Sequence, residues 1–93
     1  MNIKLTSSDH GAVNELVVAI DLMSKGYKIF RAINPNTPFD LVAYKDSKLY
    51  KIEVRTGSLN KDGGLNYRKK DRDDADIYAW VISPTIIYDP NIL

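Results

Sequence analysis

The sequence contains 93 residues, a length typical of one domain that is close to the size at which a single hydrophobic core gives only marginal stability. Hydrophobic residues make up 44% of the chain and charged residues 27%, which excludes a disordered or collagen-like protein. The absence of cysteine excludes a disulfide framework, and a single histidine excludes the usual zinc sites. We therefore expect one folded domain over residues 1–93, in which any metal has oxygen ligands.

Hydropathy and charge indicate where the protein is located and what it could bind. No apolar stretch approaches the roughly 20 residues that span a bilayer, and the first residues lack the apolar segment of a signal peptide. We expect a cytoplasmic protein without a membrane partner. The net charge is only +1, but residues 45–72 contain nine basic and four acidic side chains. Such a stretch either attracts a polyanion or forms a solvated charged face.

The first predicted element is a helix over residues 8–25. Ser7, Ser8 or Asp9 can cap its first turn, and Gly26 suits the left-handed position after its last turn. Apolar side chains recur at the spacing of an amphipathic helix, namely Val13, Leu16, Val17, Ile20 and Met23.

Strand patterns follow the helix. Residues 27–33 predict a strand, residues 34–38 a turn with two prolines, and residues 39–44 and 49–55 two strands joined by a short polar connection. The segment 56–74 is polar, although residues 65–67 have the composition of a short strand. The runs 76–82 and 85–88 predict the last two strands. The pattern indicates an α/β fold in which a helix flanks a central mixed sheet.

Acidic residues interrupt two of these strands. Alternation along residues 49–55 places Glu53 and Arg55 on one face, and a hairpin would bring Asp40 of the preceding strand beside Glu53. Two adjacent carboxylates repel each other unless a cation separates them or one of them is protonated. Because hard oxygen ligands suit Mg²⁺ or Mn²⁺, Asp40 and Glu53 predict a divalent-metal site.

Glu15 is a third acid of interest. It shares a helical stripe with Ala19, Leu22 and Met23, which we expect to face the sheet. An acid on the inner face of a helix requires a partner, and either a basic residue on the sheet or a metal-bound water would supply one.

Four short motifs together resemble a known superfamily. They are Gly11-x-x-x-Glu15, the helix end Lys25-Gly26-Tyr27, Phe39-Asp40-Leu41-Val42, and Ile52-Glu53-Val54-Arg55-Thr56-Gly57. Their order on helix, strand and strand resembles the PD-(D/E)XK nucleases over roughly residues 8–88. The likeness is greatest to small members related to homing endonucleases and Holliday junction resolvases.

The resemblance implies a restriction-endonuclease-like core and a hydrolase. Asp40, Glu53 and the backbone carbonyl of Val54 would bind Mg²⁺ (or Mn²⁺), and Glu15 would orient a water on the metal. Such a site would cleave phosphodiester bonds of DNA and leave 5′-phosphates. Cleavage of two strands needs two active centres, so we also expect a homo-oligomer, a dimer or larger.

Arg55 departs from the family pattern, which usually has lysine at this position. Arginine keeps the positive charge beside the phosphate, but it cannot be deprotonated and its planar fork positions water differently. The chain is therefore either a metal-dependent endonuclease or a nuclease-fold module that binds nucleic acid or a protein without cleaving. A structural protein with incidental acids is a third reading.

A final candidate set either contacts nucleic acid or forms a solvated loop: Tyr67, Arg68, Lys69, Lys70 and Arg72.

Overall fold

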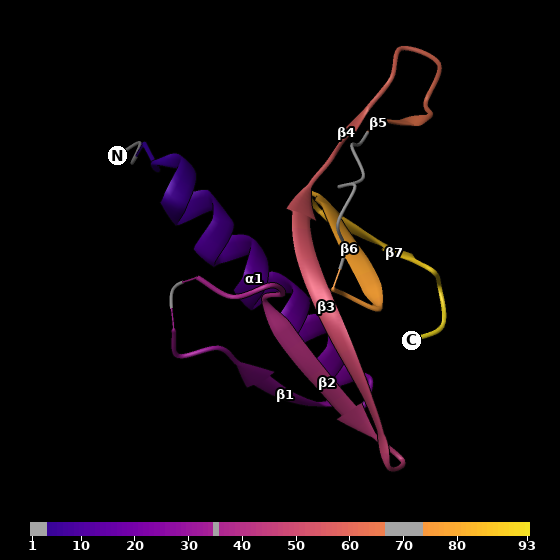
Figure 1. Ribbon diagram of the computed structural model, residues 1–93. Coiled ribbons are helices and arrows are strands. Elements are labelled where there is room, and N and C mark those ends of the chain that lie inside the picture. Colours follow the sequence, from indigo (N-terminus) through magenta and orange to yellow (C-terminus); the bar gives the residue numbers. More distant parts are fainter. Residues whose placement is uncertain (1–3, 35, 67–73) are drawn as a thin grey trace.

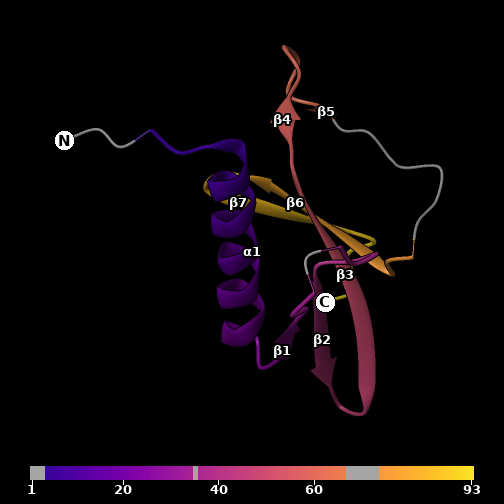
Figure 2. The ribbon, with the colours of Figure 1, turned by 60° about the vertical axis from the view of Figure 1, so that its left-hand side comes forward.

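The computed structural model describes residues 4–34, 36–66 and 74–93. One helix packs on one face of a five-stranded sheet, as the two views in Figure 1 and Figure 2 show. The elements in chain order are α1 (Ser7–Ser24), β1 (Lys28–Arg31), β2 (Leu41–Lys45), β3 (Lys48–Thr56), β4 (Ser58–Leu59), β5 (Leu65–Asn66), β6 (Ile77–Ile82) and β7 (Thr85–Asp89). The predicted α/β class with a helix flanking a mixed sheet is confirmed.

Helix α1 begins one residue before its predicted start. Thr6 is the N-cap, and not one of the three residues that the sequence suggested: its hydroxyl accepts from the Asp9 amide while the Asp9 carboxylate accepts from the Thr6 amide. This reciprocal capping box satisfies two amides of the first turn. The helix ends at Ser24, one residue before the predicted end, and Gly26 takes the predicted left-handed position after the C-cap Lys25 with a φ of 94°.

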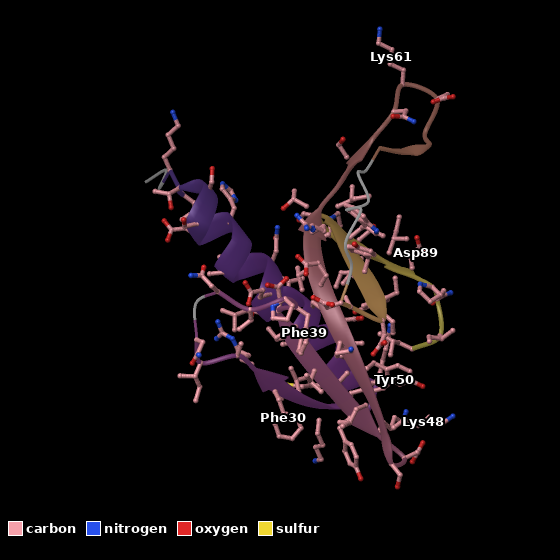
Figure 3. The ribbon with its side chains drawn as sticks, in the orientation of Figure 1. Phe30, Phe39, Lys48, Tyr50, Lys61 and Asp89 are labelled. Atoms are coloured by element: carbon pink, nitrogen blue, oxygen red, sulfur yellow. The ribbon has the colours of Figure 1, made fainter. Side chains whose placement is uncertain are left out.

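The sheet has the order β1-β2-β3-β6-β7 and is mixed. The β1–β2, β2–β3 and β6–β7 pairs are antiparallel, whereas β3 and β6 are parallel. Asp46 and Ser47 form the tight β2–β3 turn, with φ values of 52° and 65°. The small β4–β5 hairpin, which carries Lys61 near its tip, extends away from the end of β3 (Figures 1 and 3).

The core lies between α1 and the facing side of the sheet. Fully buried side chains come from the helix (Val18 and Leu22) and from three strands (Leu41, Ile52 and Ile77). Burial of each such side chain contributes about 1.5–3 kcal/mol. Within the described residues, no helix combines the length and the apolar character needed to cross a membrane.

One prediction about α1 is wrong. Ala19 and Leu22 face the sheet as expected, but Met23 of the same predicted stripe is 60% exposed. The apolar series that begins with Val13 and Leu16 is exposed as well. Apolar residues occupy more than one side of this helix, and the sheet covers the side of Val18, Ala19 and Leu22.

Candidate active site

The candidate site lies where β2 begins beside the middle of β3. The last β2–β3 pair is Leu41 with Ile52, and the Asp40 amide donates to the Ile52 carbonyl at 2.9 Å. Asp40 therefore lies beside the segment of β3 from Ile52 to Val54, which carries Glu53, as the predicted hairpin requires. Strand β3 continues to Thr56 without further β2 pairs, so its last residues line an open edge of the sheet.

The Asp40 carboxylate is fixed by the backbone of β3. Its Oδ2 accepts a hydrogen bond from the Val54 amide at 2.8 Å, in place of the next ladder bond between the strands. In an antiparallel pair, the N–H and the C=O of one residue point to the same neighbouring strand. The Val54 carbonyl is thus directed to the same open edge as the Asp40 carboxylate.

Glu53 and Arg55 share the face of β3 that is turned away from α1, since Ile52 and Val54 pack toward the core. Arg55 Nη2 lies 3.2 Å from Glu53 Oε1, and their side chains are 29% and 13% exposed. This distance makes an ion pair, but within the described part of the chain the buried Nε and Nη2 of Arg55 form no aligned hydrogen bond. Both nitrogens are buried, and Nη2 is the atom that pairs with Glu53, so the guanidinium is held inside the site by its charge.

Glu15 approaches the site from α1. Burial raises the pKa of its carboxyl group above the ordinary 4.5, the nearby charge of Asp40 raises it further, and Arg31 lowers it in part. The sequence predicted that Glu15 faces the sheet and needs a partner. The structure brings it within the electrostatic influence of Asp40 and Arg31 on the α1 side of the sheet, whereas Glu53 and Arg55 lie on the opposite face.

Two contacts near the site had no sequence signal. Asn14, one residue before Glu15, donates through Nδ2 to the Thr56 hydroxyl at 2.7 Å and so ties α1 to the end of β3. The Lys51 ammonium lies 5.9 Å from the ring centre of Phe39, which Figure 3 labels beside β3. Both contacts join segments that are distant in sequence, so no local pattern could reveal them.

A second aspartate holds β3 on its other side. The Asp76 carboxylate accepts from the Lys51 amide at 2.8 Å, and the Asp76 amide donates to the Lys51 carbonyl at 2.8 Å. Asp40 and Asp76 are therefore similar in structure, since each precedes a strand and binds an amide of β3. Only Asp40 lies next to Glu53.

The donors present fit a hard divalent ion that keeps several waters. Among the described residues, no cluster of three or more histidine, cysteine, aspartate or glutamate side chains is arranged to hold a metal. Two carboxylates, from Asp40 and Glu53, and the Val54 carbonyl are the candidate protein ligands, and Mg²⁺ commonly takes one or two carboxylates and retains water. The predicted nucleic-acid contacts Tyr67, Arg68, Lys69, Lys70 and Arg72 lie outside the described residues.

Comparisons with known proteins agree with this geometry. No curated protein matches the sequence significantly. Among solved structures, the fold is similar to that of the bacterial homing endonuclease I-Ssp6803I, with a TM-score of 0.69 and 14% sequence identity. The match covers 86% of this chain but 60% of the other, so this chain spans less than two thirds of that protein. The family model of the PD-(D/E)XK endonucleases matches residues 5–79, and the chain therefore belongs to the PD-(D/E)XK endonuclease family.

Proposed function

We propose that this protein is a metal-dependent DNA endonuclease whose active site is formed by Glu15, Asp40, Glu53 and Arg55. The observation that carries the proposal is the open edge of β3. There the acids Asp40 and Glu53 lie on neighbouring strands, and the Arg55 guanidinium pairs with Glu53. Carboxylates suit a cation and the guanidinium suits a phosphate, so this combination favours a phosphodiester as substrate.

Asp40, Glu53 and the Val54 carbonyl would hold Mg²⁺ or Mn²⁺. When bound, the ion would lower the pKa of a coordinated water and offset negative charge on the phosphate. The hydrogen bond from the Val54 amide fixes Asp40 before any ligand arrives, so the site loses little entropy on binding.

Glu15 and Arg55 would act on the water and the phosphate, respectively. The raised pKa of Glu15 makes its carboxylate a better proton acceptor, so it would orient the attacking water and accept its proton. The positive guanidinium of Arg55, which pairs with Glu53, would attract the phosphate. The water oxygen would bond to phosphorus, the bond from phosphorus to O3′ would break, and the leaving O3′ would take a proton from solvent, so the products are a 5′-phosphate and a 3′-hydroxyl.

The remaining expectations belong to the same proposal. The basic set around residues 67–72 would contact the DNA backbone, and the enzyme would act in the cytoplasm on DNA. Two active centres, one for each strand, would come from a homo-oligomer.

An end-labelled assay tests the proposal. Single-stranded, duplex and branched DNA are incubated with Mg²⁺ and then with Mn²⁺, and the product ends are typed by ligation. We expect cleavage that chelator abolishes, 5′-phosphate ends, and a loss of at least about 100-fold in Glu53→Gln. Cleavage that continues in chelator, or is unchanged in Glu53→Gln, would refute the proposed site.

One observation favours a second candidate function, a module that binds nucleic acid or a partner protein without cleaving. The ion pair with Arg55 at 3.2 Å occupies the carboxylate that Glu53 would offer to a metal. Lysine, with a compact charge and a pKa that burial can lower, would restore the usual family pattern. A wild type that binds DNA without cleaving it, together with activity in Arg55→Lys, would establish this alternative.

A further inference from the structure

Helix α1 carries an apolar stripe on the side turned away from the buried Val18 and Leu22, and Met23 at its end also borders β1 residues Ile29 and Phe30. Its five side chains are largely exposed: Val13 44%, Leu16 47%, Val17 36%, Ile20 66% and Met23 60%. Successive helical residues are rotated by about 100°, which places this stripe nearly opposite the buried Val18 and Leu22. The helix therefore has two apolar sides, of which the domain covers one.

Charged groups are absent from this stripe. Between Gly11 and Ser24 the only charged residues are Glu15 and Asp21. Glu15 is influenced by Asp40 of the site, and Asp21 accepts a hydrogen bond from Tyr88 of β7, so both turn away from the stripe. A solvated helix normally presents charged or polar side chains on its outer side. The composition of this side is that of a covered surface.

The spacing of the stripe indicates what covers it. Val13, Leu16, Ile20 and Met23 follow intervals of three, four and three residues, the a and d positions of a coiled coil. Valine and isoleucine fall at the a positions, while leucine and methionine fall at the d positions. Two such helices can pack together, because knobs from one a/d seam fit holes in an identical seam. The stripe is thus complementary to itself.

We propose that α1 of a second copy of this chain packs on the stripe, antiparallel and related by a two-fold axis near residue 18. This arrangement places Leu16 of each copy opposite Ile20 of the other, and Val13 opposite Met23. Antiparallel pairing also brings opposite ends of the two helix dipoles together. The sheet side of α1, with Glu15, remains outside the contact.

The exposed area sets the strength of this dimer. The five side chains and their small neighbours leave on the order of 500 Å² of surface per copy, so the dimer buries roughly 1,000 Å², the lower end of specific interfaces. We expect a reversible dimer with a dissociation constant of about 1–100 µM. The inference deepens the homo-oligomer part of the proposed function by naming the surface in contact, and it does not depend on nuclease activity.

Sedimentation velocity from roughly 1 to 500 µM tests the interface, since this range brackets the expected constant. Wild type should shift from monomer to dimer, and Ile20→Glu should raise the dissociation constant at least about tenfold. Leu49→Glu is the matched control, because Leu49 is 63% exposed and lies on β3 away from the stripe. Monomeric wild type throughout, or association that Ile20→Glu leaves unchanged, would overturn the proposal.

Disulfide trapping tests the orientation, and the cysteine-free sequence makes each introduced thiol unique. An equimolar mixture of Val13→Cys and Met23→Cys chains should form mixed disulfides under mild oxidation. Val13→Cys alone should form few disulfides, because the two-fold axis places its copies at opposite ends. Efficient self-crosslinking of Val13→Cys without the mixed product would overturn the antiparallel arrangement. Neither experiment uses DNA cleavage, so the outcome is independent of the activity.

Discussion

Asp40 serves the fold as well as the proposed site, and this dual role makes its substitutions informative. Asp40→Ala leaves the Val54 amide, which is partly buried, without the carboxylate that accepts its hydrogen bond at 2.8 Å. Hydrogen bonds to charged groups contribute about 1.5–3 kcal/mol. Removing a carboxylate that lies beside Glu53 and near Glu15 relieves some repulsion and offsets part of this loss. We expect Asp40→Ala to lose about 1–2 kcal/mol of unfolding free energy.

That loss corresponds to a decrease in Tm of roughly 5–15 °C for a domain of this size. Asp40→Asn keeps an oxygen acceptor in the same place, so its unfolding free energy should lie within about 0.5 kcal/mol of wild type. Urea denaturation with chelator present measures both variants without any contribution from bound metal. The account of the hydrogen bond would be refuted if Asp40→Ala were as stable as wild type, or if both variants lost the same amount.

Three further predictions concern stability. Tyr88→Phe removes the 2.5 Å hydrogen bond to Asp21 and should lower the unfolding free energy by about 1–2 kcal/mol. Burial raises the pKa of Asp21, but the hydrogen bonds from Tyr88 and Lys25 and the charge of Lys25 outweigh burial and hold that pKa below 3.8. This stabilisation is present above pH 3.8 and is lost as pH falls through the lowered pKa of Asp21. The difference in unfolding free energy between wild type and Tyr88→Phe should therefore shrink in acid. A difference that stays constant with pH would contradict the role given to this hydrogen bond. Because the pKa of Glu15 is raised in the folded state, its ionised form destabilises the fold at neutral pH. Glu15→Gln should therefore raise Tm at pH 7 but not at pH 3, and it should abolish cleavage. A lower Tm at pH 7 would contradict this prediction. In urea denaturation at monomer concentrations, Val18→Ala should lower the unfolding free energy by about 1.5–3 kcal/mol and Val17→Ala by under about 0.5 kcal/mol. Equal losses would show that Val18 does not lie on the buried side of α1.

Much of the fold follows from local patterns. Strand periodicity, the polar connection at residues 45–48 and the capping glycine at position 26 each act over a few residues, so sequence alone predicted α1 and the five strands of the main sheet to within a few positions, but not the short β4. The orientation of α1 was different. Apolar residues lie on two sides of this helix, and only packing against the sheet decides that Val18 and not Val17 is buried.

The arrangement of the candidate site could be predicted only in part. Alternation and hairpin register were sufficient to pair Asp40 with Glu53, because both follow from strand geometry. The contact of Asn14 with Thr56 joins residues 42 positions apart, and the hydrogen bond from Val54 to Asp40 replaces a ladder bond. Both depend on tertiary structure, which a local pattern does not encode.

Asp40 belongs to the proposed catalytic metal site, and the most direct measurement of this role compares it with Asp76. Both carboxylates bind a β3 amide at 2.8 Å, but only Asp40 lies next to Glu53. Initial rates of Mg²⁺-dependent DNA cleavage are measured for wild type, Asp40→Asn and Asp76→Asn at equal folded fractions. We predict a loss of at least about 100-fold for Asp40→Asn and less than about threefold for Asp76→Asn. Equal losses would reduce Asp40 to a structural role, and retained cleavage in Asp40→Asn would contradict the site.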